Sequence, residues 1–119
     1  MREKKGYKNV VAWQQADKLA FEIYIVTKNF PEYEKFGITS QLRRAALSIP
    51  TNIVEGHGRQ GEKEFKYFVN ISLGSLAEVD YLIDFSLKLK NLYRDNHKKL
   101  QKLRDVCGKL LWKFYKSFG

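Results

Sequence analysis

The chain has 119 residues, enough for one domain with one hydrophobic core but too few for two. Hydrophobic residues make up 44% and charged residues 29%, which is typical of a folded globular domain and too apolar for a disordered tail. No apolar run reaches the roughly 18 residues of a membrane span, and the start of the chain does not resemble a signal peptide, so we expect a cytoplasmic protein. The single cysteine, Cys107, excludes an internal disulfide and a metal cluster built on cysteines.

Positive charge is concentrated toward the carboxyl end of the chain. The net charge is +9, and residues 88–119 account for +8 of it, because they hold 10 of the 22 Lys and Arg residues but 2 of the 13 Asp and Glu residues. Such a concentration suits a polyanionic partner and says nothing about the fold.

The first predicted helix follows a polar segment, residues 1–9, which we expect to be a loosely ordered arm. From Val10 onward, apolar residues recur at helical spacing. Pro31 disfavours helical angles at the residue before it, so this helix is predicted to end near Asn29.

The second predicted helix has Thr39 as its expected N-cap and an apolar face that continues to Ile53. Pro50 lies inside this pattern and removes one backbone donor, so we expect it to kink the helix near Ala46 rather than to end it. The glycine-rich residues 56–61 are predicted to form a hinge before the next helix.

Two further helices complete the chain. Glu62 and Glu64 favour a helix N-terminus, and the third helix is predicted to extend to about Lys90. Asp95 is the expected N-cap of a fourth helix with leucines on one face. Four helices with short connections, and no alternating strand pattern, predict an all-α, up-down-up-down four-helix bundle that forms one domain, residues 1–119.

The third helix carries two apolar stripes. The first is the expected core stripe, which consists of Phe65, Phe68, Val69, Leu76, Val79, Ile83 and Leu87. The second lies about half a turn away and consists of Tyr67, Ile71, Gly74, Glu78, Tyr81, Phe85 and Leu89. Left in water, it would be a patch that monomers usually avoid. Either this helix is central or covered by the amino-terminal arm, or the second stripe is a subunit interface, where Gly74 and Ser75 would permit close backbone approach.

One side of the fourth helix carries a row of lysines: Lys98, Lys102, Lys109, Lys113 and Lys116. The row spans about 27 Å opposite the leucine face. It is either a solvated outer face, although such faces usually mix both signs of charge, or a surface that binds backbone phosphates without reading bases. The same segment holds three aromatic residues that could stack on unpaired bases or simply pack: Tyr93, Trp112 and Tyr115.

Motifs for catalysis and metal binding are missing from the sequence. His57 and His97 have no carboxylate or second histidine at ligand spacing, and no nucleotide-binding, nucleophile-elbow or zincin motif occurs. Cys107 lies on the leucine face, where a buried, inert thiol is expected. We therefore expect no metal, no cofactor, no small-molecule substrate and no enzymatic activity.

A polar set lines one edge of the second helix: Gln41, Arg44, Ser48, Asn52 and Glu55. Arg44 and Glu55 are predicted to pair across the Pro50 kink. We interpret the set as a hydrogen-bond network, buried or at an interface, in preference to a catalytic site, because it offers no nucleophile with a base.

Several runs of the sequence resemble one protein family. They are residues 11–16 (VAWQQA), 36–46 (FGITSQLRRAA) and 48–59 (SIPTNIVEGHGR), followed by 64–65 (EF) and 74–78 (GSLAE). Over roughly residues 8–92, the chain resembles the four-helix bundle proteins encoded within intervening sequences of bacterial 23S ribosomal RNA genes.

This resemblance implies an all-α four-helix fold, a homopentameric ring and no known catalytic activity. The family is similar in architecture to the accessory proteins of diversity-generating retroelements, which are basic pentamers that bind nucleic acid and a reverse transcriptase. Five positions of the family are kept here: Arg43, Arg44, Asn52, Glu55 and Arg59. The three arginines are further candidates for contact with nucleic acid.

Two functions are compatible with these observations. The first is a non-enzymatic oligomer that binds RNA or DNA through phosphates. The second is a protein–protein adaptor or structural oligomer with no nucleic-acid role. Binding that falls steeply with salt and shows little sequence preference would favour the first, whereas retention of a specific protein partner would favour the second. We expect no membrane partner.

Overall fold

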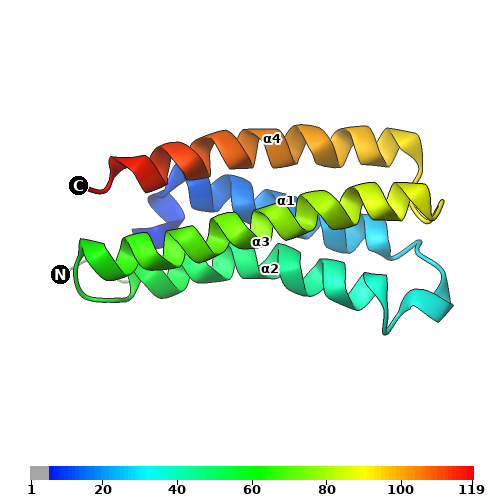
Figure 1. Ribbon diagram of the computed structural model, residues 1–119, viewed down its shortest axis with the longest axis horizontal. Coiled ribbons are helices and arrows are strands. Elements are labelled where there is room, and N and C mark those ends of the chain that lie inside the picture. Colours follow the sequence, from blue (N-terminus) through cyan, green and yellow to red (C-terminus); the bar gives the residue numbers. More distant parts are fainter. Residues whose placement is uncertain (1–5) are drawn as a thin grey trace.

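The protein is a bundle of four long helices (Figure 1). The computed structural model describes residues 6–119, and within them there is no strand. The helices are α1 (Val11–Thr27), α2 (Ile38–His57), α3 (Glu62–Lys88) and α4 (Arg94–Ser117), with two short 3-10 helices, η1 (Gly6–Asn9) and η2 (Glu32–Glu34). Each long helix packs against the next one in the chain, and α4 closes the bundle by packing against α1. The predicted all-α, up-down-up-down bundle is therefore confirmed.

The core is built from the apolar faces of all four helices. Leu19 and Ile23 of α1 and Ile53 of α2 are completely buried, as are Val79 of α3 and Leu111 of α4. The helix ends that the sequence predicts lie within two residues of the observed ends at Thr27 and Lys88. Within the described part of the chain, no helix combines the length and apolar character needed to cross a membrane.

Part of the amino-terminal arm is ordered. Residues 6–9 form η1, which packs against α1 and α2, so the prediction of a loose arm is wrong for these residues. The Tyr7 ring stands edge-on to Trp13 with 5.0 Å between centroids, and Gln14 Nε2 donates a hydrogen bond to Lys8 O. These contacts fix the segment to α1. Residues 1–5 of the predicted arm lie outside the described residues.

Two predicted N-caps are wrong. The N-cap of α2 is Gly37, and Thr39 lies inside the helix with its side chain buried in the bundle. The N-cap of α4 is Tyr93, which places Asp95 in the first turn, where its charge still suits the helix dipole. In both cases the helix begins earlier than the hydroxyl or carboxylate residue, because tertiary packing decides where the chain enters the bundle.

As predicted, Pro50 does not end α2, which continues from Ile38 to His57. The predicted kink near Ala46 is not confirmed. The side chains of the two residues after Pro50 add hydrogen bonds to carbonyl oxygens of the preceding turn. Thr51 Oγ1 donates to Leu47 O at 2.7 Å, and Asn52 Nδ2 donates to Ser48 O at 2.8 Å.

Small residues bring α2 and α3 close together. Ser72 of α3 is completely buried, and its Oγ donates a hydrogen bond to the Ile49 carbonyl oxygen of α2 at 2.8 Å. Gly56 is also buried, and a Cβ there would lie 2.8 Å from atoms of both Phe65 and Phe68.

Candidate nucleic-acid and subunit surfaces

The lysine row lies on the solvent side of α4. All five of its members are exposed: Lys98, Lys102, Lys109, Lys113 and Lys116. On the opposite side of the helix, Leu100, Cys107 and Leu111 are buried. None of the five lysines forms an ion pair with any residue from 6 to 119. Their charges are therefore not neutralised within the bundle.

Other cations of α4 serve to hold neighbouring helices. Lys99 Nζ lies 3.0 Å from Glu22 Oε2 of α1, and Arg104 Nε lies 3.1 Å from Asp80 Oδ1 of α3. These pairs flank the row on its two sides. The structure thus separates the cations of α4 into a structural group and an unneutralised group.

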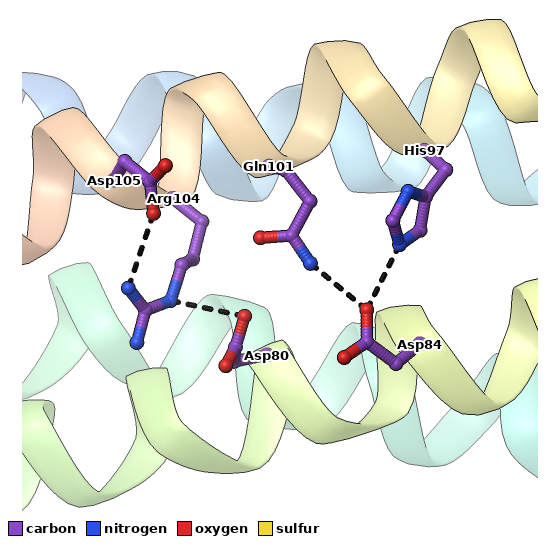
Figure 2. A network of polar contacts seen from close by, with 6 residues as sticks. All are labelled: Asp80, Asp84, His97, Gln101, Arg104 and Asp105. Atoms are coloured by element: carbon purple, nitrogen blue, oxygen red, sulfur yellow. Dashed lines mark hydrogen bonds and ion pairs between the residues drawn. The ribbon is translucent and has the colours of Figure 1, made fainter.

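A polar network joins α3 and α4 (Figure 2). Asp84 Oδ1 lies 2.8 Å from His97 Nε2 and accepts a hydrogen bond from Gln101 Nε2 at 3.0 Å. The interpretation of His97 as a histidine without a carboxylate partner is therefore wrong. Spacing along the sequence could not identify Asp84 as the partner, because Asp84 lies on the adjacent antiparallel helix, 13 residues from His97.

His57 packs among rings. It stands edge-on to Tyr7 and Phe65, with 6.2 and 5.9 Å between ring centroids.

Residues 6–119 contain no group of three or more His, Cys, Asp or Glu side chains that could hold a metal ion.

Arg43 and Arg44 lie away from the lysine row, because α2 lies diagonally across the bundle from α4. Arg43 Nε donates to Thr27 Oγ1 at 2.7 Å, and its guanidinium lies 4.8 Å from the centre of the Tyr24 ring, so it fastens α2 to α1. Arg59 lies over the Phe68 ring. Arg44 is exposed.

Only part of the predicted polar set forms a network. Ser48 Oγ lies 2.9 Å from Ser75 Oγ, and Asn52 Nδ2 donates to Ser48 Oγ at 2.9 Å. Glu55 pairs with Arg59 at 3.4 Å, so the predicted Arg44–Glu55 pair is wrong. Arg59 is one helical turn from Glu55, whereas Arg44 is three turns away. Gln41 lies apart and borders a groove.

Most of the outer stripe of α3 is exposed, and the described part of the arm does not cover it. Tyr67 and Tyr81 are 63% and 64% exposed, and Phe85 and Leu89 are also open to solvent. A Cβ on Gly74 would have no heavy atom within 4 Å. Together with Gln41, Ser48 and Asn52 of α2, these residues form a surface that we call the α2–α3 face.

The α2–α3 face contains a groove of about 410 Å³. It is lined by Glu34, Gly37, Ile38, Gln41, Tyr81, Leu82, Phe85 and Leu89. Of the described part of the arm, η1 packs on α1 and α2. Residues 6–119 of this chain therefore leave the face uncovered.

Cys107 is completely buried, as predicted. Desolvation by burial raises the pKa of its thiol from 9.0 to about 12, and the nearby Arg104 charge lowers it only in part. The thiol is protonated near neutral pH and is a poor nucleophile there.

The fold and its surfaces define an all-α four-helix bundle with an unneutralised basic face on one helix and an apolar face across two others. Residues 8–113 match the family described as 23S rRNA-intervening sequence protein, and the chain belongs to this family. Its fold is similar to the crystal structure of a protein of unknown function from the S23 ribosomal protein family of Bacteroides thetaiotaomicron. The TM-score is 0.79 over 89% of this chain and 99% of that chain, at 24% sequence identity. A comparison with curated proteins finds no match.

Proposed function

We propose that this protein is a non-enzymatic homo-oligomer that binds RNA or DNA through phosphate contacts of the lysine row. The observation that carries the proposal is the row itself: five exposed lysines on one side of α4 without ion-pair partners in residues 6–119. Unpaired cations in a row repel one another, and a polyanion that neutralises them also releases condensed counterions.

The geometry of the row suits a nucleic-acid backbone. Lys98 and Lys116 are separated by about 27 Å along the helix axis, a length that covers several backbone phosphates. Lysine provides a mobile point charge without the fixed fork of arginine. We therefore expect affinity without strong sequence preference.

Oligomerisation would occur through the α2–α3 face. Its exposed tyrosines and Phe85 are large apolar groups, and Glu34 and Glu78 lie on the same face. A ring of more than two subunits needs a different, complementary surface on the next copy. The other side of α2 offers one.

The surface between α1 and α2 exposes apolar groups beside cations. Phe21 and Leu47 are 64% and 49% exposed, and Lys28 and Arg44 border the same region. Contact of the α2–α3 face of one copy with the surface between α1 and α2 of the next copy is head-to-tail, and such contacts form a ring when the rotation between neighbouring copies closes. The ring implied by family resemblance is a pentamer.

A salt series tests the nucleic-acid proposal. Binding of a fluorescent oligonucleotide is measured for the parent protein and for the triple variant Lys102→Gln, Lys109→Gln, Lys113→Gln. We expect weaker binding of all sequences and a log–log salt slope shallower by roughly two per bound subunit.

A second triple variant provides the matched control: Lys8→Gln, Lys18→Gln, Lys90→Gln. It removes the same charge from exposed positions outside α4. An equal loss of affinity in both triple variants would show that net charge, and not the position of the lysines on α4, causes the effect. If the parent protein binds no nucleic acid and instead retains one acidic protein partner, the adaptor function replaces this proposal.

A further inference from the structure

We infer that Trp112 is a stacking platform for an unpaired base, so that the partner of the lysine row is single-stranded RNA or DNA. This inference rests on the proposed function and specifies its substrate class. It concerns the carboxyl-terminal half of α4. There the Trp112 side chain is 50% exposed, whereas the preceding residue, Leu111, is completely buried.

The indole is held in a fixed orientation. It stacks on the Tyr115 ring with 5.5 Å between centroids and an angle of 14° between planes. Lys66 of α3 lies 4.9 Å from the centre of the Tyr115 ring, and Lys116 lies 5.7 Å from the centre of the indole. A ring that is already positioned loses little conformational freedom when a base stacks on it.

The indole also borders a groove of about 390 Å³ between α3 and α4. The groove is lined by Leu73, Leu76, Ala77, Arg104, Asp105, Gly108, Lys109 and Trp112. Gly108 helps to keep it open, since a Cβ there would lie 3.3 Å from Leu76 Cδ2. The apolar lining beside a flat aromatic ring offers a place for the faces and edges of a base.

Charge around the indole suits the backbone that carries the base. Lys109 lines the groove, and Lys113 and Lys116 follow on the same side of α4. Asp105 also lines the groove, but its Oδ1 lies 3.3 Å from Arg104 Nη1, which offsets its charge. A strand that crosses the row can therefore place phosphates on lysines and one base on Trp112.

Base accessibility favours a single strand over a duplex. In a duplex, bases are paired and stacked inside, and a ring on an exposed helix face meets only backbone. In a single strand, every base offers a free face, and stacking on an aromatic residue strengthens binding without sequence preference. Lysines alone would not distinguish the two forms.

Fluorescence of Trp112 tests the inference. Trp13 is the other tryptophan, and in the variant Trp13→Phe the indole of Trp112 is the only one. Oligo(dT) of about 20 nucleotides should quench this fluorescence to saturation, because such a strand spans at least one binding site. A blunt duplex at the same phosphate concentration should bind the lysines with little quenching.

Substitution of the ring gives an independent measurement. Trp112→Ala should weaken oligo(dT) binding roughly five- to a hundredfold while duplex binding changes little, and Trp112→Phe should restore most of the affinity. Tyr33→Ala is the matched control, since Tyr33 is 83% exposed but lies in η2 between two glutamates. It should leave binding unchanged.

The outcomes separate this inference from the proposed function. If the parent binds oligo(dT) and duplex equally, and Trp112→Ala alters neither, the stacking role is wrong although the lysine row still binds. If neither nucleic acid binds at low salt, the proposed function itself fails. If Trp112→Ala changes the oligomeric mass, Trp112 belongs to a subunit contact and the inference is overturned.

Discussion

His97 on α4 lies 2.8 Å from Asp84 on α3, measured from Nε2 to Oδ1 (Figure 2). The same carboxylate oxygen accepts a hydrogen bond from Gln101, one turn further along α4. A single side chain of α3 thus holds two successive turns of the helix that carries the lysine row. The position of that row relative to the rest of the bundle depends in part on this contact.

Removal of the Asp84 carboxylate should loosen α4. We expect Asp84→Ala to lower the free energy of unfolding by about 1 kcal/mol, because two partly exposed hydrogen bonds are lost. Urea denaturation measures this change, with Asp17→Ala as the control for loss of an exposed aspartate. In a double-mutant cycle, His97→Ala should add little once Asp84 is absent; full additivity would show that the two residues are not coupled.

Two glycines should respond in opposite ways to the same substitution. Gly56→Ala should destabilise the protein by roughly 1–3 kcal/mol, because the new methyl group would lie 2.8 Å from Phe65 and Phe68. Gly74→Ala should raise the stability of the protomer by roughly 0.5–1 kcal/mol, because the position is exposed and the helix gains propensity.

Gly74→Ala also reports on assembly. If Gly74 permits close approach of a second copy, the added methyl group should weaken the oligomer even though it stabilises α3. Urea unfolding and sedimentation velocity give the two quantities separately. Unchanged assembly would place Gly74 outside the subunit contact.

A charge on the α2–α3 face should split the oligomer. We expect Ile71→Glu or Tyr81→Glu to reduce the mass measured by light scattering to that of a smaller species, while circular dichroism shows nearly unchanged helicity. Neither side chain is part of the buried core. Lys18→Glu, on the exposed side of α1, is the control for added negative charge and should leave the mass unchanged. A parent protein that is monomeric at tens of micromolar would contradict the proposal that the α2–α3 face is a subunit interface.

Cys107 should be protected from thiol reagents in the folded protein. Its pKa of about 12 leaves almost no thiolate near pH 8, and the sulfur is buried. An aromatic disulfide reagent should therefore label it slowly in buffer and rapidly in urea. Rapid labelling in the native state would mean that α4 opens readily from the bundle.

The same raised pKa has a consequence at alkaline pH. Folding favours the protonated thiol, so its contribution to stability is complete below the ordinary pKa of 9.0. This contribution is lost as the pH rises through about 12. Stability measured by urea unfolding should fall less steeply in this range for Cys107→Ala than for the parent, once its lower starting stability is taken into account. If the stability of both proteins falls equally steeply with pH, ionisation of Cys107 is not the cause of the fall.

The sequence predicts helix ends best where a local signal is strong. Pro31 and the glycines after α2 place the ends of two helices within two residues, since they act on the backbone beside them. The predicted caps at Thr39 and Asp95 fail because capping depends on where the chain turns into the bundle. Asp84, as the partner of His97, could not be found because the two residues lie 13 positions apart on different helices.

The sequence by itself determined the fold class, most of the inward-facing residues of each helix and the solvent side of the lysine row, because helical periodicity is a local property of the chain. The exposure of the outer stripe of α3 was decided by tertiary packing, since η1 packs on α1 and α2 and leaves the stripe open. Only the tertiary structure decided which cations stay unpaired. Lys99 and Arg104 lie as close in sequence to the row as its own members, yet they pair with Glu22 and Asp80 across helix boundaries. An ion pair requires two helices at a fixed distance, and that distance exists only once the bundle has packed.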